Sequence, residues 1–243
     1  MAMRILIIND DGINCEGIKI LAEFAKTLGE VTVVAPKEEQ SGKSQSVNFR
    51  TTIKIEKTDF LDGVDAYVVD STPTDCARYG IVGLDKKFDL VLSGINKGYN
   101  LGNDILYSGT AAAAFESAAR GVKAIAFSTV HNDYSSAKEN LKKVYDYIIE
   151  NKLLDYNDIY NVNIPLAPKG IKITRKTGFY YKELFILEEN GEYRQTTDFI
   201  PSYYDDLSVD VNAAMNGYIS ITPLTVDRTD ISAFEKLKKL NEN

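Results

Sequence analysis

The alternation of short apolar segments with helix-like segments over the first 165 residues is the feature that most constrains the fold. Each apolar segment has four to six residues and ends in a turn-forming or polar stretch, which is typical of buried parallel strands. The segments that we expect to form these strands are residues 4–8, 31–35, 66–69, 88–92 and 123–128.

The segments between these strands carry helix signals. Apolar residues recur at helical spacing over 18–28, a small-residue helix is expected over 110–120, and a longer helix over 137–150. Thr72 followed by Pro73 is a typical helix start, because threonine caps the free N–H groups and proline fits the first helical position. The alternation predicts a Rossmann-like α/β fold, with a doubly wound, mainly parallel sheet between two helical layers.

The last third of the chain has a different pattern. Short strands are expected over 171–177, 179–187, 192–197 and 217–222, followed by a terminal helix over 231–240, and Glu189-Asn190-Gly191 is a hairpin turn signal. We therefore expect a single domain, 1–243. Its core is predicted to cover about 1–165 plus 217–224, and a strand-rich extension with the terminal helix about 170–243.

Charge and hydropathy exclude several classes of function. The net charge is -7, the sequence pI is about 4.9, and no basic stripe is present, so we expect no binding of long nucleic acids. The apolar run at the N-terminus covers only residues 5–8, too short for a signal sequence or a membrane span. The sequence thus predicts a cytoplasmic protein without a membrane contact, whose partners include small phosphate esters if a metal supplies positive charge.

The scarcity of histidine and cysteine restricts the kind of metal site. The chain has one histidine, His131, for which we expect a surface or loop position, and two cysteines, Cys15 and Cys76, which we expect to be free thiols. A histidine-rich zinc site is therefore excluded. Any metal must be held mainly by oxygen atoms, which favours Mg²⁺, Mn²⁺ or Ca²⁺.

Two adjacent carboxylates follow the first predicted strand. Asp10 and Asp11 lie where ligands bind in open α/β sheets, at the carboxyl end of a strand, and Gly12 allows a tight turn behind them. Neighbouring carboxylates repel each other unless a cation or protons relieve the repulsion. A divalent metal site is one interpretation; a polar turn in which one acid caps the next helix is the other.

Three further motifs follow strand ends on the same predicted side. Asn96 follows the strand at 88–92, Ser108-Gly109-Thr110 precedes a helix whose free N–H groups suit an anion, and Ser41 lies in the long polar loop 36–52. Taken alone, each is equally an ordinary turn, cap or solvated loop. Their convergence with Asp10 and Asp11 predicts an active site.

These motifs resemble the SurE (survival protein E) family of nucleotidases. The resemblance covers nearly the whole chain and is most specific over residues 93–110. The segments that carry it are Asn9-Asp10-Asp11-Gly12, Gln40-Ser41-Gly42, Thr72-Pro73-Thr74-Asp75, Ser93-Gly94-Ile95-Asn96 and Tyr107-Ser108-Gly109-Thr110.

The resemblance implies a 5'/3'-nucleotidase that acts on nucleoside monophosphates, with a side activity on short polyphosphate. It implies one divalent metal ion per subunit, Mg²⁺ or Mn²⁺, and a homodimer or homotetramer that exchanges C-terminal elements. The implied metal ligands are Asp10, Asp11, Ser41 and Asn96. The implied catalytic residues are Asp10, Asp11 and Asn96, and the implied phosphate-binding residues are Ser41, Asn96, Ser108, Gly109 and Thr110.

Two other readings stay open at this point. Asp10 could act as a covalent nucleophile, as in aspartyl-phosphate phosphatases, although those enzymes use an Asp-x-Asp spacing and the two acids here are adjacent. The chain could also be a non-catalytic nucleotide-binding or interaction protein, since a fold alone never establishes catalysis.

Overall fold

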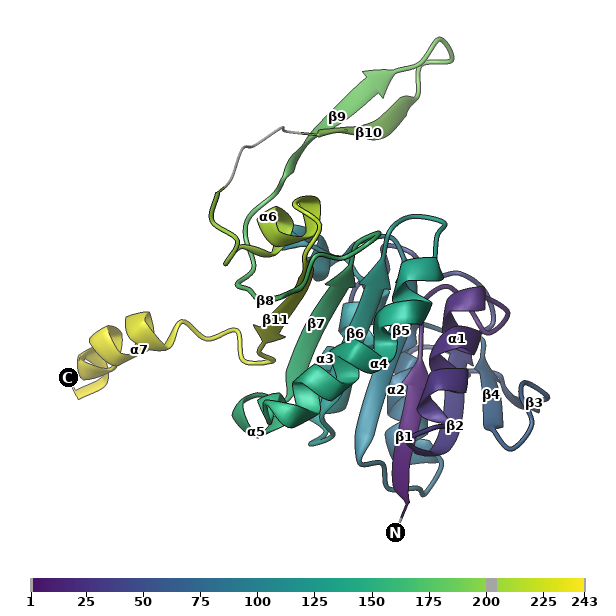
Figure 1. Ribbon diagram of the computed structural model, residues 1–243. Helices are drawn as coiled ribbons and strands as arrows, with labels where there is room; N and C mark the ends of the chain where they lie inside the picture. The colour runs from purple at the N-terminus through teal and green to yellow at the C-terminus, as the bar shows by residue number, and fades with distance from the viewer. Residues whose placement is uncertain (1, 200–204, 243) are drawn as a thin grey trace.

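The computed structural model describes residues 2–199 and 205–242, and its centre is a nine-stranded sheet (Figure 1). The strand order is β3-β4-β2-β1-β5-β6-β7-β11-β8. All neighbours from β4 to β7 are parallel, whereas β3 and β11 pair antiparallel with their inner neighbours. The strands are β1 (Met3–Ile8), β2 (Gly29–Pro36), β3 (Ile55–Thr58), β4 (Asp65–Val69), β5 (Leu90–Lys97), β6 (Ala124–Thr129), β7 (Ile159–Ile164), β8 (Ile171–Ile173) and β11 (Ile219–Leu224).

Helices cover both faces of this sheet. One face packs against α1 and α4, and the other against α2 and α3. The helices are α1 (Glu16–Ala25), α2 (Pro73–Arg78), α3 (Gly109–Ala119), α4 (Ser135–Glu150), α5 (Leu153–Tyr156), α6 (Asp210–Met215) and α7 (Ile231–Leu237). The predicted class, a three-layer, doubly wound α/β fold, is confirmed.

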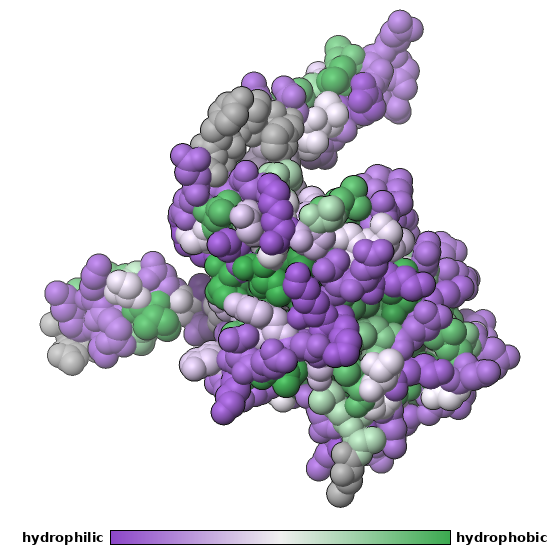
Figure 2. Space-filling view, in the orientation of Figure 1, coloured by the Kyte–Doolittle hydropathy of each residue, from purple (hydrophilic) through white to green (hydrophobic). Residues whose placement is uncertain are grey.

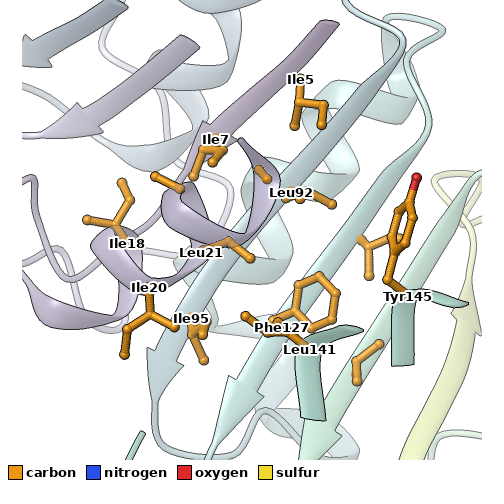
Figure 3. Close-up of a cluster of buried hydrophobic side chains, with 14 of the residues drawn as sticks. Ile5, Ile7, Ile18, Ile20, Leu21, Leu92, Ile95, Phe127, Leu141 and Tyr145 are labelled. Carbon is orange, nitrogen blue, oxygen red and sulfur yellow. The ribbon is translucent and has the colours of Figure 1, made fainter. Parts of the chain in front are cut away.

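The alternation of side chains along the central strands builds both halves of the core. In β1, Ile5 and Ile7 join the cluster under α1 and α4, while Leu6 and Ile8 join the cluster under α2 and α3. Figure 3 shows the first cluster, where Phe127 from β6 lies among residues of α1 and α4. Because both faces are covered, the strand reads as a continuous apolar run rather than an alternating one.

Several strands differ from the predicted pattern: β3 was not predicted, β8 ends at Ile173 rather than at residue 177, and β5 and β7 differ near the predicted site. β5 does not end at Leu92 but continues to Lys97, so Asn96 lies in its irregular last part, where the register with β6 shifts. Pairing with β6 therefore holds residues 93–97 in a strand, although their sequence locally resembles a turn. β7 was not predicted because Asn161 and Asn163 interrupt its apolar pattern, yet both are fully buried and donate to the backbone oxygen of Asn100.

The predicted hairpin is confirmed and extends away from the sheet (Figure 1). Strands β9 (Tyr181–Leu187) and β10 (Tyr193–Phe199) pair antiparallel, and Gly191 in their turn has a φ of +82°. We call β9, β10 and their turn the arm. The arm and α7 both carry apolar side chains among hydrophilic ones on their surface (Figure 2). Over residues 2–199 and 205–242, none of the helices has the length and apolar character that a membrane span requires.

Candidate active site

Asp10 and Asp11 follow Asn9 at the carboxyl end of β1, an inner strand of the sheet. The Asn9 Nδ2 donates to the backbone oxygen of Gly12 at 2.9 Å, and Gly12 has a φ of +93°, a conformation that favours glycine. This tight turn holds both acids in the interior. Asp10 is 5% exposed and the side chain of Asp11 is 2% exposed.

Burial raises the pKa of both carboxyl groups. The pKa of Asp10 rises to about 6, chiefly through burial, with a further contribution from the charge of Asp11, while the hydrogen bond from Thr110 opposes the rise. Burial likewise raises the pKa of Asp11, against the stabilising backbone and ammonium groups of Lys97. Two buried carboxylates that resist ionisation are favourable ligands for a cation, because a bound cation offsets the cost of burying their charges and their mutual repulsion.

The start of α3 packs directly against Asp10. The Thr110 Oγ1 donates to Asp10 Oδ1 at 2.5 Å, and Ser108 caps the helix by accepting from the Ala111 amide at 3.0 Å. A Cβ atom on Gly109 would lie 2.7 Å from the Asp10 Cβ and 2.9 Å from its Oδ2. Only glycine therefore lets the N-terminus of this helix approach the carboxylate so closely, and a hydrogen bond from the Thr110 backbone helps to lower the pKa of Asp10.

Ser41 and Asn96 are brought to the same place by two other segments. The backbone N–H of Gln40 donates to the backbone oxygen of Asp10 at 2.7 Å, which holds the long loop beside β1. Ser41, Asn96 and Ser108 line one pocket of about 570 Å³. Ser41, Asn96 and Ser108 therefore share one pocket, while Asp10 contacts Thr110 and Asp11 accepts from the backbone N–H of Lys97, the residue after Asn96. Ser108 and Thr110 use their side-chain oxygens for the helix cap and for Asp10.

Lys97 and Glu39 are site residues that the sequence reasoning missed. The Lys97 Nζ lies 2.7 Å from Glu39 Oε2 and 3.7 Å from Asp11 Oδ1, and Glu39 Oε1 accepts from Ser41 Oγ at 2.6 Å. These contacts raise the pKa of Lys97 and lower that of Glu39. Lys97 follows Asn96 and Glu39 lies two residues before Ser41, so their positions in the sequence pointed to the site. Their ion pair, however, forms only in the folded chain.

Asn100 is a further residue beside the site, and it anchors the loop that follows β5. It is buried, its backbone amide donates to Asn163 Oδ1 at 2.8 Å, and its Nδ2 donates to Ser128 Oγ at 2.9 Å. The buried asparagines of β7 therefore hold this loop in place. His131 is exposed, as expected, and its Nδ1 lies 3.1 Å from the backbone oxygen of Lys97.

The predicted ligand set fits a hard divalent cation. Within the described part of the chain, no group of three or more His, Cys, Asp or Glu side chains is arranged to hold a metal. The four predicted ligands are two carboxylates, one hydroxyl and one amide, so they offer oxygen atoms only. Oxygen ligands with remaining positions for water suit Mg²⁺ or Mn²⁺. Both cysteines, Cys15 and Cys76, are free thiols as predicted.

Comparison with known proteins identifies the family. The family model described as "Survival protein SurE" matches residues 5–183. A protein named 5'-nucleotidase SurE from Clostridium botulinum (strain Alaska E43 / Type E3) is 40% identical over 99% of this chain and 100% of its own length. Another of that name from Legionella pneumophila subsp. pneumophila (strain Philadelphia 1) is 39% identical over 98% of this chain and 97% of its own.

A solved structure agrees with these sequence matches. The crystal structure of the SurE protein from Aquifex aeolicus superposes with a TM-score of 0.80 at 36% identity, covering 98% of this chain and 99% of that one. Sequence and fold match over almost the full length, and the motifs that carried the resemblance meet at one end of the sheet. The chain therefore belongs to the SurE family.

Proposed function

We propose that this protein is a divalent-metal-dependent phosphomonoesterase that hydrolyses nucleoside 5'-monophosphates to nucleoside and phosphate. The observation that carries the proposal is the contact between Asp10 and the start of α3, which joins a cation site to an anion site. A phosphate ester with its activating metal needs both sites side by side. The relatives named 5'-nucleotidase SurE support the choice of substrate.

The residues divide into two groups by what they would hold. Asp10, Asp11, Ser41 and Asn96 would hold the metal, which supplies Lewis acidity and activates water when bound. The start of α3 at Ser108, Gly109 and Thr110 would bind the phosphoryl oxygens, where the helix dipole stabilises the charge that grows during hydrolysis. Thr110 Oγ1 donates to Asp10 and so orients this carboxylate between the two sites.

Lys97 and Glu39 would position the first group without touching substrate. Glu39 accepts from Ser41, and Lys97 holds Glu39 while its own backbone amide donates to Asp11 Oδ2 at 3.3 Å. This chain of contacts orients two of the four proposed ligands. A matched positive charge beside Asp11 also reduces the cost of burying that carboxylate before the metal binds.

The family resemblance extends the proposal further. We infer a second activity on nucleoside 3'-monophosphates, a side activity on short polyphosphate, a cytoplasmic location, and a homodimer or homotetramer. The exposed apolar residues of the arm and α7 support subunit exchange; examples are Phe185, Leu187, Phe234 and Leu237. Light scattering tests the assembly, and a mass equal to one chain would refute it.

Phosphate release from 5'- and 3'-nucleoside monophosphates tests the activity, with Mg²⁺, Mn²⁺ or EDTA in parallel. We expect metal-dependent release that falls at least about 100-fold in Asp10→Asn, because a first ligand is lost. Asp62→Asn is the matched control, since Asp62 is an exposed acid outside the proposed site and should keep full activity. Phosphate release by the wild type in EDTA would refute the proposal. So would the absence of release from every nucleotide with every metal.

The other two interpretations predict different results in other measurements. A covalent mechanism predicts a trapped phospho-Asp10 adduct, which hydrolysis by activated water does not form. A non-catalytic binder predicts nucleotide affinity without turnover, and unchanged affinity in Asp11→Asn. We expect neither result, because two adjacent buried carboxylates serve a metal better than they serve simple nucleotide binding.

A further inference from the structure

The pocket beside the proposed phosphate site has a polar part and an aromatic part. The polar part is formed by Ser41, Asn96 and Ser108, which the proposed chemistry already uses. The aromatic part is lined by Tyr99, Tyr107, Tyr180 and Tyr181. A metal ion and a phosphate group need no aromatic surface, and the volume of about 570 Å³ lies within the usual range for small-molecule sites. The pocket therefore has room for a ligand with an aromatic end.

Asp104 fixes two of these rings. The Tyr180 hydroxyl donates to Asp104 Oδ2 at 2.8 Å, and the Tyr181 hydroxyl donates to Asp104 Oδ1. The two rings lie edge to face with centroids 5.1 Å apart and an interplanar angle of 80°. Burial and the nearby carboxylate raise the pKa of both phenols, so both stay protonated as donors. One carboxylate thus holds two aromatic rings at the base of the arm.

The other two tyrosines belong to the loop that leads into α3. Tyr99 packs with Tyr180 against a small buried cluster that includes Leu101, and burial raises its pKa to about 12. Tyr107 directly precedes the helix cap Ser108, and the residue is 48% exposed. Tyr107 therefore connects the aromatic part of the pocket with the start of α3.

We propose that these four tyrosines bind the nucleobase of the nucleotide whose phosphate is held at the start of α3, with Asp104 as a positioning residue. The proposal rests on the proposed nucleotidase function and names the group that its substrate must carry. Stacking tolerates every base, because each base has an aromatic face. We therefore expect little discrimination among the four bases and weak binding of phosphate esters that lack a base.

The test compares 5'-nucleoside monophosphates with ribose 5-phosphate, which has the same sugar and phosphate but no base. In Tyr107→Ala and in Tyr181→Ala, we expect KM for all four nucleotides to rise about tenfold or more, with kcat nearly unchanged. Hydrolysis of ribose 5-phosphate should be unchanged. Tyr107→Phe should retain the wild-type KM, and Tyr193→Ala is the control, since Tyr193 is 67% exposed on the arm and does not line the pocket.

The role of Asp104 is tested by the same comparison of nucleotides with ribose 5-phosphate. We expect Asp104→Ala to raise the nucleotide KM as Tyr181→Ala does, and Asp104→Asn to recover part of the loss because its amide oxygen still accepts one phenol. Equal loss on nucleotides and on ribose 5-phosphate would overturn the proposal, because it would assign the tyrosines a purely structural role.

A second measurement separates this proposal from the proposed activity. Calorimetric titration with adenosine, which has no phosphate, reports on the aromatic part even if the protein hydrolyses nothing. Binding to the wild type that is lost in the Tyr107→Ala, Tyr181→Ala double variant supports the base site. Absence of binding to the wild type, or equal binding to both proteins, would overturn it.

Discussion

The central sheet and the arm contain the same types of apolar residue in opposite surroundings. Phe127 in β6 is fully buried between the sheet and its helices, whereas Phe185 in β9 is 65% exposed. The sheet completes its core within one chain, and its strand ends hold the acids at fixed positions. The arm has no such cover from its own chain in the described residues, so its apolar surface is available to a partner. Burial of the sheet fixes the positions of the proposed active-site residues, and exposure of the arm leaves its apolar residues available to another subunit.

The largest expected difference between the two regions is in stability. Phe127→Ala removes a fully buried ring and should lower the free energy of unfolding by about 3–5 kcal/mol. Phe185→Ala should change it by less than about 0.5 kcal/mol in the isolated subunit, because the ring is exposed. Urea unfolding at low protein concentration measures both. Similar losses in the two variants would break the comparison.

The next effect concerns the cost of burying Asp10. Its pKa in the folded protein is about 6, above the ordinary value of 3.8, so ionising this group disfavours the folded state. The cost is absent below about pH 3 and complete above about pH 6, where it is on the order of 3 kcal/mol. In EDTA, Asp10→Asn should therefore be more stable than the wild type at pH 7.5.

Denaturant unfolding at several pH values checks this sign. The advantage of Asp10→Asn should shrink as the pH falls from 6 to 4 and disappear below about pH 3, where the wild-type carboxyl is protonated in both states. At pH 7.5, added Mn²⁺ should stabilise the wild type but not the variant, because only the folded wild type binds the metal. A wild type that is more stable than Asp10→Asn in EDTA at pH 7.5 would contradict the account.

A smaller effect is expected where α3 approaches Asp10. Gly109→Ala places a methyl group 2.7 Å from the Asp10 Cβ, so the helix or the carboxylate must shift, and phosphate release should fall about tenfold or more. Gly178→Ala is the matched control, because a Cβ there meets nothing within 4 Å and its backbone is not left-handed. Full activity in Gly109→Ala would show that the contact has no functional weight.

The smallest effect concerns the charge of Lys97. Its ammonium group lies 3.7 Å from Asp11 Oδ1 and repels an incoming cation, so Lys97→Met should tighten Mn²⁺ binding about three- to tenfold. Lys97→Arg keeps the charge and should leave the affinity nearly unchanged. Isothermal titration measures both variants. Weaker Mn²⁺ binding in Lys97→Met would indicate that holding Glu39 and Ser41 matters more than the repulsion.

Much of the sheet could be predicted because its strands are buried on both faces and are therefore apolar throughout. β7 and the end of β5 are exceptions, because they contain polar residues or glycine. β7 carries Asn161 and Asn163 to hold the loop at Asn100, and the end of β5 carries Gly94 and Asn96, which locally favour a turn. In both cases pairing with neighbouring strands outweighs local preference, and a single sequence does not reveal that pairing.

The candidate site was predictable to the extent that it follows from strand ends. Asp10, Asp11 and the start of α3 could be located because parallel strands and their following helices deliver polar groups to one edge. The contacts of Lys97 with Glu39, and of Asp104 with Tyr180 and Tyr181, join segments more than 50 residues apart. Such contacts depend on how loops meet in space, which spacing along the chain does not encode.

The central claim is that Asp10 links a cation site to an anion site. The most direct test is calorimetric titration of Mn²⁺ into the wild type and Asp10→Asn, each with and without inorganic phosphate. We predict that phosphate tightens Mn²⁺ binding to the wild type, that Mn²⁺ tightens phosphate binding by the same factor, and that Asp10→Asn loses both effects. Equal Mn²⁺ affinity in the two proteins, with no influence of phosphate, would contradict the account.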